Sequence, residues 1–327
     1  MDTLDMPSLI TGDGPGAAPA ALTAPGTLSV TPADCGCGCG GKGKATADTG
    51  GGCGCGGKKS GMSPLAYPIG RIGVSFASQT RRDSIWRAVN GGREGDLKPI
   101  SNEALLSLFQ NSPFQAQSVV WTLSRTDVPM YAIVPNGAFA AETYKWLVQE
   151  WADPQVEFAS IPGVIAGQGT LYDGSVVDLL VPDLRGMSSW SMTAYTQAIV
   201  RERRILDAAI GEAQLMQEVN RYLSKIMFTI RNRGVTPEDR ALNAAATNAF
   251  NVSPVITQAG REGMTLRDVR VERSPMNRAG SEYYDVLLTF FDPAKRLEKA
   301  PLLARFTIDV ADTVPVVIGE PSIWYEY

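Results

Sequence analysis

The chain has 327 residues, of which 44% are hydrophobic and 20% are charged, and its formal net charge is −4. This length and apolar content suit one large domain or two small ones, and the small net charge gives no electrostatic footprint for nucleic acid or an acidic membrane. The sequence contains no histidine. That absence excludes Ser-His-Asp and Cys-His catalysis and any histidine-ligated metal site.

The N-terminal arm, residues 1–62, is rich in Gly, Ala, Thr, Pro and Asp and shows neither helical nor strand periodicity. Such a segment cannot bury enough apolar surface to offset its ordering entropy, so we expect it to be disordered. Acidic residues stand where a signal peptide carries Lys or Arg, and no apolar run is long enough to span a bilayer. We therefore expect a cytoplasmic protein in a reducing compartment.

The folded domain is expected to span residues 63–327 and to begin with a strand near Tyr67, in "YPIGRIGVSF". A helix follows in "SQTRRDSIWRAVNG", where Ser78 or Thr80 is a suitable N-cap. "SNEALLSLFQ", with Ser101 or Asn102 as a candidate N-cap, and "FQAQSVVWTLSR" predict two more helices from their apolar spacing. The strand "PMYAIVP" and the helix "AAETYKWLVQEWAD" come next.

The segment "IPGVIAGQGTLYDGSVVDLLVP" predicts two strands joined around Asp173-Gly174, a dipeptide suited to a tight hairpin turn. Residues 188–232 repeat apolar residues at helical spacing, with Ser188 and Ser189 as candidate caps. Gly211 predicts a break between two helices in this stretch, because glycine costs about 1 kcal/mol relative to alanine inside a helix.

A third helix of this half starts at Thr236-Pro237, in "TPEDRALNAAATNAF", and is expected to reach about Asn251. Three alternating segments complete the chain: "LRDVRVERSP", "EYYDVLLTFFDP" and "LLARFTIDVADTVPVVIG". They predict a C-terminal antiparallel meander. The sequence therefore predicts an α+β fold with mixed N-terminal strands and helices, long central helices and a C-terminal antiparallel β-meander.

Eight segments carry a family resemblance, in order from residue 69 to residue 316: "IGRIGVSFASQTRRDS", "VVWTLSRTDVPMYAIVPNGAFAAETY", "SIPGVIAGQ", "LRGMSSW", "DRALNAAATNAF", "VERSPMNR", "LTFFDP" and "RFTIDVADTVPV". In these segments the chain resembles the C-terminal domain of unknown function of the PatA and PatG cyanobactin maturation proteases. In that family the domain follows a subtilisin-like protease that cuts or macrocyclises ribosomally made peptides. A chain without histidine has no such triad, so the resemblance implies a peptide-maturation system and not proteolysis.

All five cysteines lie in the arm and each is followed by glycine: Cys35, Cys37, Cys39, Cys53 and Cys55. An odd count in a reducing compartment disfavours disulfides. Thiolates could bind Zn²⁺ or Cu(I), although Cys-x-Cys differs from the usual zinc spacing of Cys-x2-4-Cys. A Gly-rich flexible linker that carries thiols is a further alternative.

A fourth interpretation treats the cysteine tract as a substrate for thiol chemistry. To form a thiazoline, a cysteine sulfur attacks the carbonyl carbon of the preceding residue, and glycine leaves that carbon least obstructed. Every cysteine of the tract except Cys35 follows glycine. On this hypothesis the tract resembles the core of an azole-forming peptide, fused to the maturation-family domain, and release would need cleavage near Gly57-Lys58-Lys59.

Two polar groupings on predicted helices are candidate peptide-binding surfaces: Arg81, Arg82 and Asp83 on the first helix, and Arg240, Asn243, Thr247 and Asn248 on the alanine-rich helix. Arginine forks can hold peptide carbonyls or a carboxylate. For the first group the alternative is an ion-paired, solvated helix face. For the second it is a buried helix whose polar groups satisfy neighbouring backbone.

Three acidic residues accompany the last strands, Asp285, Asp292 and Asp309. They could include an acid/base pair, but turn capping and pairing with Arg278 or Arg305 also explain them. No acylation, P-loop or dinucleotide-binding motif occurs. We therefore expect no cofactor and no catalytic residue.

The sequence favours a non-catalytic accessory or scaffold protein in the maturation of ribosomally synthesised, post-translationally modified peptides. Its expected partners are peptide-maturation enzymes or a precursor peptide, and the long helices and six tryptophans suggest a homo-oligomer. The alternative is a thiol- or metal-handling protein whose cysteine-rich arm binds Zn or Cu on an oligomeric platform.

Overall fold

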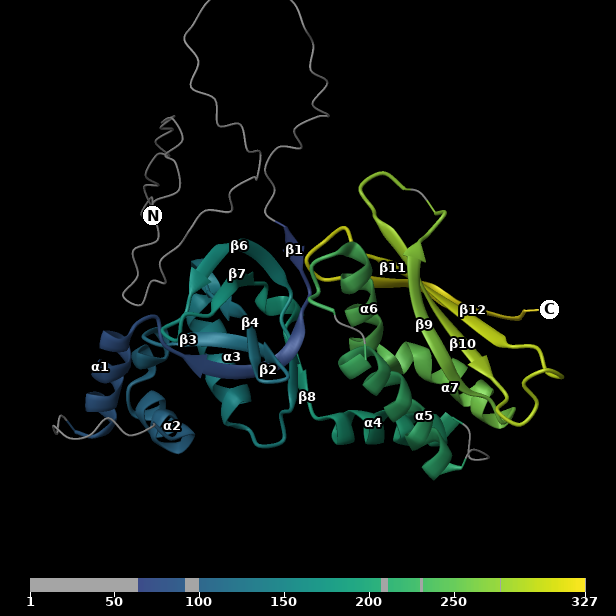
Figure 1. Cartoon of the computed structure of the whole chain (residues 1–327), viewed down its shortest axis with the longest axis horizontal. Coiled ribbons are helices and arrows are strands. Elements are labelled where there is room, and N and C mark those ends of the chain that lie inside the picture. Colours follow the sequence, from purple (N-terminus) through teal and green to yellow (C-terminus); the bar gives the residue numbers. More distant parts are fainter. Residues whose placement is uncertain (1–63, 92–99, 207–210, 230–231, 277, 327) are drawn as a thin grey trace, which may run out of the picture.

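A computed structural model describes residues 64–91, 100–206, 211–229, 232–276 and 278–326. Two β-sheets stand side by side, and helices α4 to α7 lie next to the C-terminal sheet (Figure 1). The two sheets contribute mainly to two different hydrophobic clusters, although Ile69 and Phe158 of the larger sheet join the cluster of the smaller one. The predicted α+β fold with a C-terminal antiparallel meander is therefore confirmed. None of the helices in the described ranges combines the length and the apolar character of a membrane span.

The larger sheet has eight strands in the order β1-β6-β7-β4-β3-β2-β5-β8. Antiparallel pairing predominates in it, and β4 pairs with β7 in parallel. The strands span Leu65–Ala66 (β1), Ile69–Ser75 (β2), Val120–Arg125 (β3), Val128–Ile133 (β4), Phe158–Ser160 (β5), Gly163–Thr170 (β6), Val176–Pro182 (β7) and Ser188–Trp190 (β8).

Three helices accompany this sheet: α1 (Gln79–Val89), α2 (Asn102–Asn111) and α3 (Ala140–Ala152). Side chains from all three join strand residues in one buried cluster, which includes Ile85, Phe109, Trp121 and Leu147. The predicted N-caps are confirmed at two helices, because Ser78 accepts from the Arg81 amide and Ser101 accepts from the Ala104 amide, each at 3.2 Å.

The helix predicted in "FQAQSVVWTLSR" is wrong. A short 3-10 helix, η1 (Pro113–Gln117), precedes strand β3. The run from Val119 to Leu123 is apolar, β-branched and aromatic, and it is buried within the sheet, where such residues pack better than in a helix. Periodicity alone does not separate a short buried strand from a helix.

The predicted hairpin between β6 and β7 is confirmed by their antiparallel register. Gly174 takes φ +87°, and Asp173 Oδ1 accepts from the Ser175 amide at 2.9 Å. A second hairpin, β3–β4, turns at Thr126 (φ 49°) and Asp127 (φ 63°). Two-residue turns of this kind need a positive φ at both central residues.

The prediction that Ser188 and Ser189 cap a helix is wrong, because both residues belong to strand β8. Helix α4 (Met192–Leu206) starts after Ser191, whose hydroxyl accepts from the Ala194 amide at 3.0 Å. The expected break at Gly211 is confirmed, since Gly211 is the N-cap residue of α5 (Glu212–Ser224). A π-helical segment, η4 (Lys225–Thr229), continues from α5.

The helix predicted to end near Asn251 is two helices, α6 (Pro237–Thr247) and α7 (Ala249–Arg261), which meet at Asn248. Thr236 caps α6 as predicted. Helix α7 continues past the predicted end although it contains Pro254, which has no amide hydrogen. The Ser253 hydroxyl donates to the Phe250 carbonyl at 2.7 Å and so gives that oxygen a partner.

The smaller sheet has the order β12-β11-β10-β9 and is antiparallel throughout: β9 (Thr265–Arg273), β10 (Tyr283–Phe291), β11 (Leu302–Asp309) and β12 (Val316–Tyr325). Alternate residues of β10, such as Val286 and Leu288, join the same buried cluster as the alanines of α6. Small alanine side chains let α6 lie close to the sheet.

The molecule has two halves: the first holds the larger sheet with α1 to α3, and the second holds α4 to α7 with the smaller sheet. Tyr67, which lies between β1 and β2, connects them. Its amide donates to the Gly234 carbonyl at 2.7 Å, and its carbonyl accepts from Asn243 Nδ2 at 2.7 Å. Gly234 has φ +75°, and a Cβ there would lie 2.6 Å from the Tyr67 carbonyl. The chain that leads into the first sheet is therefore fixed to the loop before α6 and to α6 itself.

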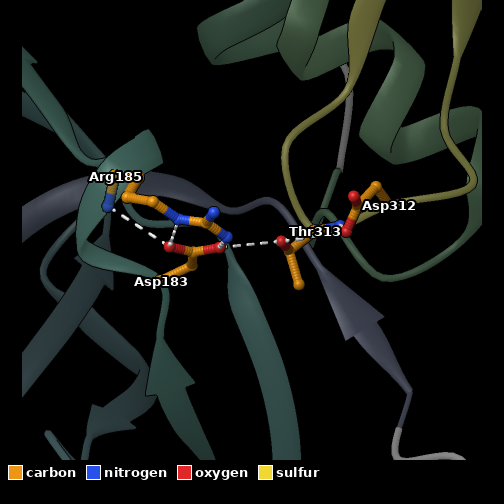
Figure 2. A network of polar contacts seen from close by, with 4 residues as sticks. All are labelled: Asp183, Arg185, Asp312 and Thr313. Carbon is orange, nitrogen blue, oxygen red and sulfur yellow. Dashed lines mark hydrogen bonds and ion pairs between the residues drawn. The ribbon is translucent and has the colours of Figure 1, made fainter. Parts of the chain in front are cut away.

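A polar network also joins the halves, between the loop after β7 and the loop between β11 and β12 (Figure 2). The Asp183 carboxylate accepts from Arg185 Nε at 3.1 Å, from Arg185 Nη2 at 2.8 Å and from the Thr313 hydroxyl at 3.0 Å. The hydrogen bonds from the Arg185 side chain are the main cause that lowers the pKa of Asp183. Next to this network, Gly186 packs against Val314 and Pro162.

Candidate functional site

The first predicted grouping lies in the opening turns of α1, where Arg81, Arg82 and Asp83 are half-buried. Asp83 accepts from Gln79 Nε2 at 2.8 Å, and the Arg82 guanidinium lies 5.8 Å from the centre of the Tyr172 ring. These contacts match the alternative of a helix face that is paired within the molecule. These contacts lie in the half that holds the larger sheet, whereas the second grouping lies on α6 in the other half.

The second grouping is largely inside the molecule: Arg240 is 5% exposed and Asn243 is 3% exposed. Asn243 and Asn232 exchange two amide hydrogen bonds of 2.8 and 3.2 Å, and Asn243 Nδ2 also donates to Tyr67. The side-chain nitrogen and the side-chain oxygen of Asn243 thus both form hydrogen bonds within the fold. This geometry matches the alternative in which a buried helix satisfies neighbouring backbone.

The other three residues of this grouping also form contacts within the fold. Arg240 lies 3.7 Å from Glu282, and desolvation lowers the pKa of Arg240 while the Glu282 charge raises it. The half-buried Thr247 hydroxyl shares a 3.0 Å hydrogen bond with the Tyr67 hydroxyl. Asn248 Nδ2 donates to the Ala244 carbonyl at 2.8 Å, at the end of α6.

The three candidate aspartates do not converge on one point. Asp285 is 1% exposed and accepts from the Thr307 hydroxyl at 2.7 Å, with Arg305 at 3.9 Å. Asp292 and Asp309 accept backbone amides in turns, from Ala294 at 2.9 Å and from Glu282 at 3.0 Å. Turn capping and pairing with Arg305 therefore account for their positions.

The five cysteines of the arm, Cys35, Cys37, Cys39, Cys53 and Cys55, lie outside the described residues. Within the ranges that are described, no group of three or more His, Cys, Asp or Glu side chains is arranged to hold a metal ion. The metal hypothesis and the substrate hypothesis for the arm therefore both stay predictions from the sequence.

Two hollows flank Arg71 where the first sheet meets η4, and we call them together the Arg71 groove. One, of 190 Å³, is lined by residues 69–71, the β3–β4 turn, Phe158 and Phe228. The other, of 260 Å³, is lined by Arg71, Ile72 and residues between Glu150 and Glu157. Backbone strain concentrates at functional sites, and Thr126, a β-branched residue at positive φ in this lining, is such a strained position.

Arg125 lines the groove and binds carbonyls of the π-helical segment. Its guanidinium donates to the carbonyls of Asn232, Ile226 and Met227. Desolvation lowers the pKa of Arg125, whereas the Asp239 charge raises it. Short π-helical segments are frequent at functional sites, and two carbonyls within this one accept from the half-buried Arg125 guanidinium.

Two aromatic rings line the groove and contact further aromatic side chains. Phe228, on η4, is 64% exposed, and its ring centre lies 6.0 Å from that of Phe158. The Arg71 guanidinium lies over the other ring of this pair, 5.8 Å from the centre of Phe158. The Phe158 ring also lies 6.5 Å from that of the half-buried Trp190, which in turn lies 5.9 Å from the ring of the half-buried Tyr195.

Three carboxylates complete the lining: Asp127, Glu150 and Glu157. The Ser189 hydroxyl donates to Glu150, and the Met192 amide at the start of α4 donates to Glu157 at 3.0 Å. Asp127 is exposed at the hairpin tip. A groove with aromatic faces, one stacked guanidinium and acidic walls is suited to an uncharged or basic extended peptide.

A third hollow, of 560 Å³, lies among α2, η1 and α3. Its lining is mainly apolar and includes Phe109, Tyr144, Val148 and Phe114, which is 64% exposed. It has fewer charged residues than the Arg71 groove. Phe114 is therefore an equally exposed comparison for Phe228.

Sequence reasoning missed the Arg71 groove because its lining comes from four separate segments. Arg71, Arg125, Phe158 and Phe228 are each unremarkable in sequence. The one local signal is "SRTDVP", a charged turn between two strands, and the helix predicted in "FQAQSVVWTLSR" ends inside it.

The chain is thus an α+β domain with two sheets. Its two halves are joined at Tyr67, and the Arg71 groove lies where the first sheet meets η4. A family model described as PatG Domain matches residues 65–160, and one described as PatG C-terminal matches residues 210–324. A solved structure entitled "PatG Domain of Unknown Function" is 30% identical, and the match covers 81% of this chain and 100% of that one with a TM-score of 0.68. No curated protein matches the chain. The chain belongs to the PatG domain family.

Proposed function

We propose that this protein is a non-catalytic accessory or scaffold protein of peptide maturation, and that its cysteine-glycine arm is a substrate-like segment. The observation that carries the proposal is that one chain combines a PatG-family domain with a tract in which four of the five cysteines follow glycine. All five cysteines precede residue 65, where the first family match begins. The resemblance to cyanobactin maturation proteins supplies the peptide-processing context.

The chemistry proposed for the arm is ring closure between a cysteine and the residue before it. The sulfur forms a bond to the preceding carbonyl carbon, the carbonyl oxygen leaves as water with the thiol and amide protons, and a C=N bond closes the thiazoline. Loss of two further hydrogens to a partner dehydrogenase gives the thiazole. The chain has no histidine to act as the base, so a separate cyclodehydratase would carry out the first step.

Coexpression with a cyclodehydratase, followed by intact-mass measurement, tests this proposal. We expect losses of about 18 Da per modified cysteine and about 2 Da more after oxidation. A chain with all five cysteines replaced by alanine is the control and is expected to keep its mass. An unchanged wild-type mass overturns the substrate role. Stoichiometric zinc or copper on the reduced wild-type chain, absent from the control, would instead support the metal-binding alternative.

A further inference from the structure

We propose that the Arg71 groove binds the Cys53–Cys55 segment of the same polypeptide. This inference rests on the proposed function, because it assigns the domain a place to hold its own substrate-like segment. The groove lies beside the entry of the arm into the fold: residues 69–71 line it, and the first strand, β1, starts at Leu65.

Chain length allows this contact within one molecule. A chain spans at most about 3.3–3.6 Å per residue, so Ile69 lies within about 14 Å of Leu65. Cys55 precedes Leu65 by ten residues, which span at most about 36 Å. The tether is therefore longer than the distance it must cover and short enough to give an effective concentration in the millimolar range.

The chemistry of the groove suits this occupant. Sulfur makes favourable contacts with aromatic rings, and a flat azole ring would stack on the same kind of face, which the exposed Phe228 ring provides next to the buried Phe158. Glycines on both sides of each cysteine let the backbone approach a wall closely.

Charge complementarity favours the same segment. Lys58 and Lys59 follow Cys55 after two glycines, and no acidic residue stands between Cys55 and Leu65. The groove presents Asp127, Glu150 and Glu157 against Arg71 and the internally bonded Arg125. The two lysines would therefore enter a region with one more negative than positive charge.

Alkylation rates of the individual cysteines test the proposal on the full reduced chain. Trypsin cleaves after Lys44 and Lys58 and so separates Cys53 and Cys55 from Cys35, Cys37 and Cys39 for mass spectrometry. For an intrinsic dissociation constant of about 0.1–1 mM, a millimolar effective concentration slows alkylation of Cys53 and Cys55 about two- to ten-fold. The substitution Phe228→Ala is expected to remove this protection.

Phe114→Ala is the matched control, since both phenylalanines are 64% exposed and lie at different hollows. It is expected to leave the protection intact, and melting temperatures check that both variants fold. Equal alkylation rates in wild type and Phe228→Ala overturn the proposal. Protection that disappears on dilution also overturns it, because it would place the segment in the groove of a second molecule.

The docking and the proposed function fail separately. A chain that shows the protection but gains no rings on coexpression with a cyclodehydratase keeps the docking and loses the substrate role. A chain that gains rings but shows no protection loses the docking alone.

Discussion

Asn243→Ala gives a quantitative test of the junction between the two halves. The substitution removes an amide that donates to the Tyr67 carbonyl at 2.7 Å and accepts from Asn232 at 2.8 Å, in a place where Asn243 and Asn232 are each 3% exposed. Each buried group that loses its partner costs about 1–3 kcal/mol. Asn232 keeps its bond to the Gly234 amide at 2.8 Å, which limits its loss.

We therefore expect unfolding to become easier by about 2–4 kcal/mol, which lowers the melting temperature by roughly 5–15 °C for a domain of this size. Scanning calorimetry measures the change. Asn111→Ala, on the exposed end of α2, is the control, and its effect is expected to stay within about 0.5 kcal/mol. A melting temperature for Asn243→Ala within 2 °C of wild type would refute the account of Asn243 as a structural junction residue.

Three further results are expected. Gly186→Ala places a Cβ 2.4 Å from Val314 and 2.6 Å from Pro162, so overpacking lowers stability by about 1–3 kcal/mol, measurable by denaturant titration; an unchanged midpoint contradicts this. Because the pKa of Asp183 is lowered in the folded protein, its carboxylate stabilises the fold above the ordinary aspartate pKa, and this stabilisation is lost as pH falls through the pKa of the folded state. Asp183→Asn should therefore lower the free energy of unfolding at pH 7 and do so less toward pH 2; a loss that does not change with pH argues against this account. Burial raises the pKa of Tyr131 and Tyr195 to about 12, so these rings stay neutral in the folded chain and stability declines above pH 10; ultraviolet titration with all tyrosines ionising near 10 would disprove it.

Local signals in the sequence predicted local structure well. Ser78, Ser101 and Thr236 each cap a helix because the capping bond spans only three residues. The strand β3 was missed because an apolar run of five residues fits both a buried strand and a helix turn. The division of α6 from α7 at Asn248 was missed because the following residues continue to favour a helix, and Pro254 falsely marks an end.

The candidate site depends on contacts that no local pattern reports. Arg125 meets the carbonyls of residues about one hundred positions away, and Phe158 meets Phe228 across seventy positions. The polar face predicted on α6 has the expected residues, but its surroundings bury Arg240 and Asn243. Spacing predicts which side chains share a helix face, whereas burial is decided by what packs against that face.

The position of Tyr67 between the two halves has a consequence for the order of events during synthesis. Its carbonyl binds Asn243, which follows it by 176 positions. At about 5–20 residues per second, a ribosome needs roughly 9–35 s to make the intervening chain. The last strand of the N-terminal sheet, β8, is complete at Trp190, but Tyr67 still lacks its partners at that point, since the Gly234 carbonyl and α6 are made later. The nascent first half therefore waits with Tyr67 unanchored, and the arm that precedes it emerges from the ribosome before the groove it is proposed to enter has its η4 wall.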